Sequence, residues 1–329
     1  MKKTSAAELG LHLLEIEVTS KCNLNCRHCY NRGEKNNNLP LEKIEELFVF
    51  AQENSVKTVV ISGGEAMLYK NFDGLLALIQ QHKGNYRVVL QTNGTFINEN
   101  TLDKIKAFDL IHLSYDYNDT ISEKGNDNLK RAIFLKSHGI QCYLFSSIHK
   151  KNKNHIKAMV QEANDGGIPI AFNICIPMHK LTDEDLLDND EFFEVEGVLY
   201  DLQKKGKILR YGSPLVAVRD KGKESTYTGN KGGCTAGVAA CIVSSSGKVF
   251  PCPFLRIEAG NIFKEELKDI WLESSIFNAF RQREKFEGAC KGCAFLSYCG
   301  GCRGRAYKLT GKLNGSDPKC YKERFLQSK

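Results

Sequence analysis

The stretch VTSKCNLNCRHCYNRG, residues 18–33, follows an apolar segment and contains Cys22, Cys26 and Cys29. A structural zinc site normally has four ligands, so three cysteines are one short, although His28 could supply the fourth. An iron–sulfur cube also takes four thiolates, and three would leave one iron open to a small-molecule ligand. The spacing by itself leaves both kinds of metal site open.

Strand-like and amphipathic helical segments alternate through the first 180 residues. The strand-like segments are rich in Val, Ile, Leu and aromatic residues, and several helical segments end in glycine. This alternation predicts a parallel sheet with helices outside, in an α/β fold. Six units are too few for a closed eight-stranded barrel, so we expect an open, partial (β/α)6 barrel. The predicted strands are residues 11–18, 58–64, 87–94, 109–117, 142–148 and 169–177.

Polar motifs stand at the ends of four predicted strands. The cysteine motif, SGGE (62–65), QTNG (91–94) and LSYD (113–116) each lie at or just after such an end. Ligand sites of parallel sheets lie at the carboxyl ends of the strands. Each of the three later motifs could also be a simple turn or cap, but their corresponding positions favour one shared site.

Composition and charge limit the class of protein. The net charge of +7 is spread along the chain and residues 181–197 are acidic, so we expect no nucleic-acid binding. No apolar run is long enough for a membrane span, and the N-terminus does not have the pattern of a signal peptide. We therefore expect a cytoplasmic protein. Grouped cysteines in a reducing compartment indicate metal binding rather than disulfides.

The alternating pattern ends near residue 180. We predict a barrel domain at 1–180, a bridging segment at 181–233, and a cysteine-rich domain at 234–329. Because periodicity weakens in the last segment, we expect it to have little apolar core of its own and to depend on metal for its stability.

Eight cysteines lie in the last domain, which is the ligand number that two four-iron cubes require. Two CxxC pairs, at 290–293 and 299–302, also look like parts of a zinc ribbon or a redox-active dithiol. The gap between the pairs is shorter than zinc sites normally use. Cys142 and Cys175 lie singly in predicted strands, where a free cysteine is usually buried core.

The motif CNLNCRHC resembles the hallmark of the radical S-adenosylmethionine (SAM) superfamily, CxxxCx(aromatic)C, with His28 at the aromatic position. The resemblance continues through SGGE, QTNG and LSYD in the same order. It implies a [4Fe-4S] cluster on Cys22, Cys26 and Cys29 whose open iron binds SAM. Lys124 stands where related enzymes often have an arginine for the SAM carboxylate. The implied SAM-binding residues are Gly63, Gly64, Glu65, Asn93, Ser114, Asp116 and Lys124.

The cysteine-rich domain resembles the SPASM domain, a C-terminal extension of radical SAM enzymes that mature peptides. The resemblance implies two auxiliary [4Fe-4S] clusters, and hence three clusters in all. One departure is that two residues rather than the usual three separate Cys299 from Cys302. The implied ligands are Cys234, Cys241, Cys252 and Cys302 for one cluster (set A) and Cys290, Cys293, Cys299 and Cys320 for the other (set B).

These resemblances imply an enzyme that cleaves SAM reductively to a 5′-deoxyadenosyl radical and abstracts hydrogen from a peptide. Cross-linking, thioether formation and epimerisation are the expected outcomes. The tail of residues 299–320 also resembles enzymes of haem and haem d1 biosynthesis, so tetrapyrrole side-chain processing is an alternative. An iron–sulfur module that senses redox state is another, but it would need neither GGE nor the strand-end residues.

Catalytic residues and partners follow less directly. Cys175 is a candidate hydrogen-atom donor, and Tyr115 could face either the substrate or the core. The chemistry implies an external electron donor of the flavodoxin or ferredoxin type. Because the first strand begins near residue 11, we expect any leader peptide to be recognised by the mouth of the barrel, by residues 181–233 or by a separate leader-peptide-binding protein.

Overall fold

The structure is a computed structural model that describes residues 10–31, 37–116, 127–178, 180–220 and 233–322. Its chain contacts divide it into two compact units, which we describe separately. The strand unit comprises Leu14–Tyr211 and Ser244–Ser246, and the cysteine-rich unit comprises Met1–Leu13, Gly212–Val243 and Gly247–Lys329. The domain limits given above stay a prediction.

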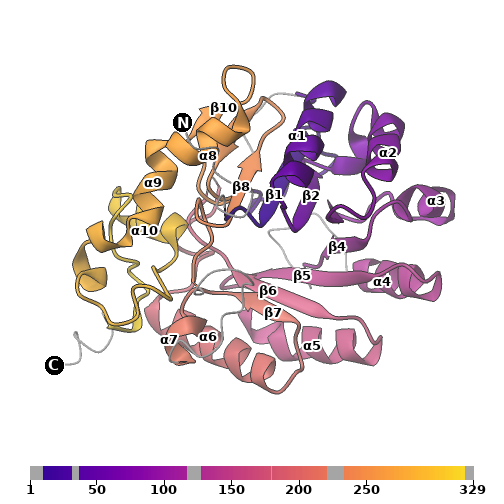
Figure 1. Cartoon of the computed structure of the whole chain (residues 1–329). Helices are drawn as coiled ribbons and strands as arrows, with labels where there is room; N and C mark the ends of the chain where they lie inside the picture. Colours follow the sequence, from indigo (N-terminus) through magenta and orange to yellow (C-terminus); the bar gives the residue numbers. More distant parts are fainter. Residues whose placement is uncertain (1–9, 32–36, 117–126, 179, 221–232, 323–329) are drawn as a thin grey trace. The chain divides into compact units, whose positions relative to one another are not determined.

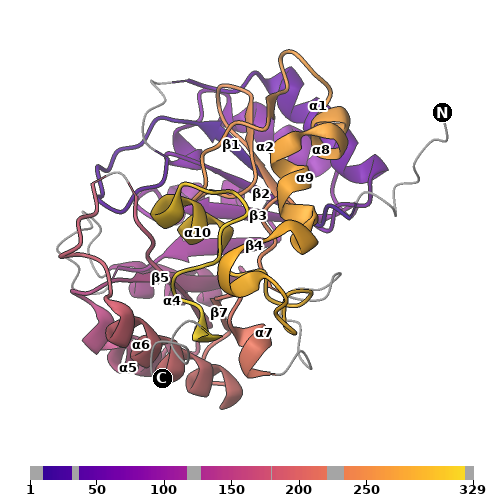
Figure 2. The ribbon, with the colours of Figure 1, turned by 90° about the vertical axis from the view of Figure 1, so that its left-hand side faces the viewer.

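The strand unit is built on a sheet in which β1 to β7 follow one another in sequence order. The pairings of β2 with β3, β3 with β4, β4 with β5 and β5 with β6 are all parallel. Figure 2 labels β1 to β5 of this sheet. The six predicted strands are confirmed to within a few residues at their ends. The strands are β1 (Leu13–Thr19), β2 (Thr58–Gly63), β3 (Arg87–Thr92), β4 (Leu110–Ser114), β5 (Cys142–Ile148), β6 (Ile170–Ile174) and β7 (Arg210–Gly212).

A helix follows each of the first six strands, which confirms the expected α/β class with its partial barrel. In α1, which Figure 1 labels, the residues at 44, 47, 48 and 51 are buried, and their spacing is that of one helical face. Asn71 caps the start of α2 by accepting a hydrogen bond from the Gly74 amide at 3.3 Å. The helices are α1 (Leu41–Glu53), α2 (Phe72–Gln81), α3 (Leu102–Ile105), α4 (Asp127–Ser137), α5 (Ile156–Asp165) and α6 (Asn189–Lys204).

The two faces of this sheet differ in character. On the outer face, Cys142 donates its thiol hydrogen to the Ala132 carbonyl of α4, at 3.4 Å. Because strand side chains alternate, the partners of Cys142 in the sheet share that face and are aliphatic. The opposite, inner face is polar and aromatic; it holds Glu15, Glu17, Ser62, Gln91, His112, Ser114, Tyr143, Phe145, Ser147 and Asn173.

The segment predicted as a bridge contains the sixth helix, α6. Asp188 caps it by accepting from the Glu191 amide at 2.9 Å, and the Glu191 carboxylate accepts from the Asp188 amide at 3.0 Å. This reciprocal arrangement is a capping box. The strand unit extends to Tyr211, so α6 belongs with the parallel strands.

The cysteine-rich unit has a small antiparallel sheet, in which β9 pairs with both β8 and β10. The expectation of little apolar core was wrong, because Trp271, Phe277, Phe280 and Phe286 are all at most 2% exposed. Arg281 covers the Trp271 ring at 4.2 Å from its centroid. The elements are β8 (Ala240–Val243), β9 (Lys248–Phe250), β10 (Gly260–Asn261), α7 (Val216–Arg219), α8 (Leu267–Glu273), α9 (Ser275–Arg281) and α10 (Arg303–Thr310).

The helices were compared with the requirements of a membrane span. Among the residues that the structure describes, none of the helices combines the length and the apolar character that a membrane span needs.

Candidate active site

The cysteine loop follows β1 directly. Cys22 reaches the surface, Cys26 is buried and Cys29 is half-buried. The Cys29 amide donates to the Cys26 carbonyl at 3.3 Å, which closes a turn between the second and third cysteines. Partial burial raises the pKa of the Cys22 thiol, and the negative charges of Glu65, Cys29 and Cys26 raise it further. Ionisation of the Cys22 thiol is therefore unfavourable unless a cation lies beside it.

Two glycines hold the end of β2 against this loop. The Gly64 amide donates to the Thr19 carbonyl at 2.7 Å, and the Glu65 amide donates to the Lys21 carbonyl at 2.8 Å. Gly63 has a φ of +148°, and a Cβ there would lie 2.3 Å from the Thr19 carbonyl oxygen. A Cβ on Gly64 would lie 2.4 Å from the Lys21 carbonyl oxygen. Only glycine permits this approach of two backbones.

The Glu65 carboxylate joins the ends of β2 and β3. It is only 1% exposed. Its Oε1 accepts from the Thr92 hydroxyl at 2.7 Å and the Met67 amide at 3.1 Å, while Oε2 accepts from the Asn93 amide at 2.8 Å. These bonds fix the position of a buried negative charge beside the cysteine loop.

Two asparagines extend the network to β4. The Asn93 side-chain amide donates to Asn23 Oδ1 at 2.9 Å and lies 3.9 Å from Cys22 Sγ. Asn128, in the first turn of α4, donates to the Asn93 carbonyl at 2.8 Å and to the Ser114 carbonyl at 2.5 Å. Sequence reasoning missed Asn128, since nothing in its neighbourhood resembles a motif.

The fourth strand end brings Asp116 to the cysteine loop. Asp116 is 3% exposed, and its Oδ2 lies 3.7 Å from Nε2 of His28. His28 occupies the aromatic position of the cysteine motif. Ser114 lies at the end of β4, where its carbonyl holds Asn128. Lys124 lies outside the described residues.

Further contacts anchor the loop between and after its cysteines. Arg27 forms an ion pair at 2.5 Å with Asp185, whose side chain is fully buried. The Tyr30 hydroxyl bonds to Glu15 Oε1 at 3.1 Å and accepts from Gln91 Nε2 at 3.1 Å. These long-range partners were not foreseen from the sequence, although every one of them has an ordinary polar side chain.

The two catalytic candidates lie differently. Tyr115 is buried, and its hydroxyl donates to Glu162 of α5 at 3.1 Å, so it lies with the helices. Cys175 is half-buried, just after β6, and its amide donates to the Ile148 carbonyl at 2.8 Å. Cys142 is core, as expected, and burial raises the pKa of its thiol to about 11.

Replacing Gly64 with alanine tests the close approach of the two backbones. The new methyl group meets backbone rather than a mobile side chain, so we expect the loops to separate, at a cost of about 1–3 kcal/mol. We expect calorimetry to show SAM affinity lowered at least tenfold. Gly166→Ala is the control, because its Cβ would lie 3.2 Å from the end of the Ile133 side chain and no closer than 3.5 Å to the backbone oxygen of Glu162. Equal affinity in the Gly64 variant and the wild type would contradict the prediction.

In the cysteine-rich unit, six of the eight thiols have another thiol nearby. Burial raises the pKa of Cys290, with smaller contributions from Cys320 and Cys293. Burial likewise raises that of Cys299, again with contributions from Cys320 and Cys290. In the same way, burial and the charge of Cys234 raise the pKa of Cys302. The thiols near Cys290 and Cys299 belong to set B, and the thiol near Cys302 belongs to set A.

A buried ion pair lies between the two cysteine sets. Arg305 donates to both Asp317 oxygens, from Nε at 2.7 Å and from Nη2 at 2.6 Å. Asp317 also accepts from the Cys302 amide at 2.8 Å and the Lys319 amide at 3.1 Å. Although burial opposes ionisation, these partners hold the pKa of Asp317 below its usual range.

A family model described as the radical SAM superfamily matches residues 16–193. The chain belongs to the radical SAM superfamily. A second model, for the iron–sulfur cluster-binding SPASM domain, matches residues 234–294. This radical SAM protein is therefore an enzyme that uses SAM and iron–sulfur clusters.

Relatives and solved structures agree with this family. The chain is 27% identical to the AdoMet-dependent heme synthase of Methanosarcina barkeri (strain Fusaro / DSM 804), over 94% of this chain and 95% of the relative. It is 26% identical to the subtilosin biosynthesis protein AlbA of Bacillus subtilis (strain 168), over 87% of this chain and 66% of AlbA. The structure of Streptococcus suis SuiB bound to SAM has the same fold, with a TM-score of 0.75, 20% identity and coverage of 94% of this chain and 77% of SuiB.

The residues of this radical SAM enzyme fit its cofactors. Among the described residues, no three His, Cys, Asp or Glu side chains converge tightly enough to bind one metal ion. Cluster ligands need not do so, because each thiolate binds a different iron. The eleven cysteines other than Cys142 and Cys175 offer thiol donors of the kind that such clusters take, and the backbone approach at Gly63 and Gly64 matches a cradle for a small ligand.

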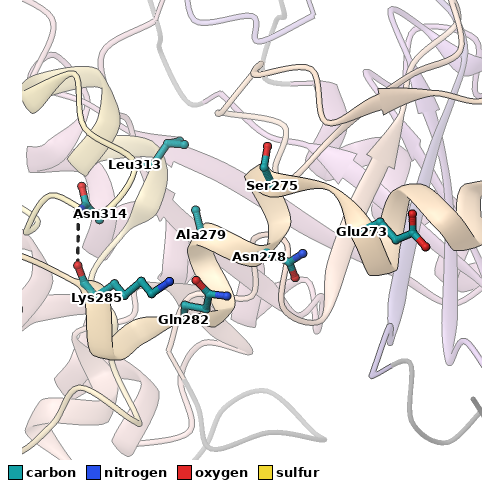
Figure 3. A pocket seen from close by; sticks show the side chains of 8 residues that line it. All are labelled: Glu273, Ser275, Asn278, Ala279, Gln282, Lys285, Leu313 and Asn314. Atoms are coloured by element: carbon teal, nitrogen blue, oxygen red, sulfur yellow. Dashed lines mark hydrogen bonds between the residues drawn. The ribbon is translucent and has the colours of Figure 1, made fainter.

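A pocket in the cysteine-rich unit is separate from this donor set. It has a volume of about 460 Å³, and no cysteine lines it (Figure 3). The Asn314 side chain closes one end by donating to the Lys285 carbonyl at 3.3 Å. The lining residues are Glu273, Ser275, Asn278, Ala279, Gln282, Lys285, Leu313 and Asn314.

Proposed function

We propose that this enzyme holds a [4Fe-4S] cluster on Cys22, Cys26 and Cys29, binds SAM beside it, and carries two further clusters on sets A and B. The supporting observation is the network that ties the cysteine loop, the glycine pair and Glu65 into one edge of the sheet. When bound, the cluster and SAM supply a 5′-deoxyadenosyl radical, which abstracts a hydrogen atom from the substrate.

The chain's own residues bind and orient SAM. Glu65 is a fixed, buried carboxylate, so it suits the ammonium group of SAM. We assign the ribose hydroxyls to Ser114 and Asp116, because carboxylate and hydroxyl groups accept from such donors. Asn93 orients the loop at Cys22, and Lys124 would bind the SAM carboxylate. An external flavodoxin or ferredoxin would supply the electron.

A peptide is the substrate class that the inner face favours. Glu15 and Glu17 are both buried there, at 5% and 0% exposure. The inner-face positions of β1, β2, β4, β5 and β6 carry no Lys or Arg, while Arg87 and Arg210 stand at the amino ends of β3 and β7, the ends opposite to the cysteine loop. Buried carboxylates would repel the several carboxylates of a tetrapyrrole, whereas a peptide can be neutral or cationic. A separate protein would present any leader segment.

Tetrapyrrole side-chain processing is the second candidate. It is supported by the similarity to a heme synthase of nearly equal length, which spans almost the whole of both chains. AlbA, by contrast, is longer than the matched region. The two candidates share the radical chemistry and differ only in what the site accepts.

Stimulated SAM cleavage separates the two candidates. After anaerobic reconstitution, we expect about twelve irons per chain, from three cubes, and release of 5′-deoxyadenosine on reduction with SAM. A Cys- or Thr-rich peptide encoded beside the gene should raise that release at least tenfold, and a haem precursor should not. The reverse result would select the tetrapyrrole. Absence of 5′-deoxyadenosine from protein with its full iron content would reject both.

A further inference from the structure

Arg303, the first residue of α10, is a buried cation with incomplete hydrogen bonding. Its side chain is 2% exposed. Nη1 donates to the Gly315 carbonyl at 2.8 Å and the Leu313 carbonyl at 3.3 Å. Nε and Nη2 are buried and have no hydrogen-bond partner in the described part of the chain. Buried donors on a charged group are costly unless something accepts from them.

The orientation of this guanidinium is fixed. It stacks on the Phe286 ring, 4.3 Å from the ring centroid, and the two carbonyls hold one of its edges. A Cβ on Gly301 would lie 3.1 Å from Nη2. The edge without partners is therefore near the CGGC turn, residues 299–302.

No carboxylate balances this charge among the described residues. Asp317 is already bonded through both oxygens to Arg305. A second guanidinium, that of Arg283, bonds only to carbonyls, among them that of Cys234 at 3.3 Å. A Cβ on Gly300 would lie 3.3 Å from Cζ of Arg283, so the two guanidiniums flank neighbouring glycines of the CGGC turn. Two cations thus share a buried region, an arrangement that calls for an anion.

The anion belongs on the side of Cys299, a member of set B. Nη2 lies close to Gly301, and the Gly301 amide donates to Cys299 Sγ at 3.3 Å. Phe286, on which the guanidinium stacks, lies four positions before Cys290, which also belongs to set B. A cluster held by four thiolates carries net negative charge, and its sulfur atoms accept hydrogen bonds.

We propose that Arg303 is the counter-cation of the set B cluster, donating from Nε and Nη2 to sulfur atoms of that cluster and raising its reduction potential. The inference rests on the proposed ligand set. A fixed positive charge stabilises the reduced cluster more than the oxidised one, because the reduced form carries one more electron. Arg303 thereby makes the set B cluster easier to reduce.

A redox titration of the full, reconstituted chain tests this role. Electron paramagnetic resonance follows each cluster; SAM addition identifies the SAM-binding cluster, and Cys299→Ala identifies the set B signal by its loss. Arg303→Met removes the charge and keeps the approximate length of the side chain. We expect the reduced-to-oxidised ratio of set B to fall at least tenfold at fixed potential, a shift of about 59 mV for one electron, with the other two midpoints unchanged.

Two variants make the outcome specific. Arg303→Lys keeps the charge without the fork of donors, so the midpoint potential of its set B cluster should lie between those of the wild type and Arg303→Met. If Arg303→Met binds less iron than the wild type, the midpoint of Arg303→Lys decides the test instead. Lys308→Met removes an exposed charge of the same helix and should leave all midpoints unchanged. If Arg303→Met carries its full iron content and its set B cluster has the wild-type midpoint potential, the proposed role of Arg303 is wrong, while the proposed ligand set is unaffected. Unchanged iron content in Cys299→Ala would overturn the set B assignment as well.

Discussion

Cys26→Ala will abolish 5′-deoxyadenosine formation and lower the iron content by about four atoms per chain from about twelve. Cys26 is the buried member of the cysteine loop, and its carbonyl closes the turn to Cys29. Loss of one thiolate leaves two ligands for the cube that binds SAM, too few to retain it. The measurements are product release with SAM and reductant, and iron and sulfide content after anaerobic reconstitution.

The matched control for this variant is Cys142→Ala. Cys142 is a buried thiol of the same unit that bonds to the Ala132 carbonyl of α4. Its replacement should leave iron content and product formation at wild-type levels. Product formation by the Cys26 variant would remove the assignment of the SAM-binding cluster. A loss of iron in the control would show that the count reports folding of the unit rather than ligation.

Asp317→Asn should destabilise the cysteine-rich unit by about 3–5 kcal/mol, because it leaves Arg305 as a buried charge without its partner. It also weakens the bond that holds the Cys302 amide. We expect a lower melting temperature and loss of auxiliary-cluster iron, with the SAM-binding cluster retained. Thermal unfolding and iron analysis of the anaerobic holoenzyme measure both effects.

The Asp317 prediction has a pH dependence of defined sign. Its partners hold the pKa of the folded-state carboxyl below the unfolded value. The stabilisation is therefore fully present above the ordinary carboxyl pKa of about 3.9 and is lost as pH falls below it. The melting temperature of the wild type should decline across this range more steeply than that of Asp317→Asn.

Two comparison variants complete the Asp317 test. The double variant Arg305→Met with Asp317→Leu replaces the pair by apolar side chains and should recover much of the lost stability. Asp73→Asn removes an exposed carboxylate that pairs with Lys104, and it should leave the melting temperature unchanged. A melting temperature for Asp317→Asn equal to that of the wild type would contradict the prediction.

The positions of the strands were predictable from the sequence because a short local run of β-branched residues decides them. Runs such as TVVISGG and RVVLQTNG combine β-branched residues with a glycine at the end, and the strands lie there. The meeting of SGGE with the cysteine loop followed from parallel connectivity alone. The acidic stretch that runs into the start of α6 contained a capping-box signal, Asp188 with Glu191, but its charge suggested a solvated bridge.

Other parts of the site required three-dimensional information. Asn128 lies 35 positions from Asn93, and Asp185 lies 158 positions from Arg27. No local pattern encodes such pairs, since an asparagine or aspartate is equally suited to solvent. Arg303 is the extreme case, because charged residues are almost never fully buried without a partner. Its sequence context, CRGRAY, gives no sign that one arginine pairs with Asp317 while the other does not.

The Glu65 network has a consequence for the energetics of ligand binding. Protein groups alone fix Gly64, Glu65 and Asn93 relative to the cysteine loop. In the proposed site, SAM would not have to order this edge of the sheet on binding, because the conformational entropy of these backbones is already lost in folding. Part of the affinity of the proposed site for SAM would then come from the preorganised fold rather than from the ligand.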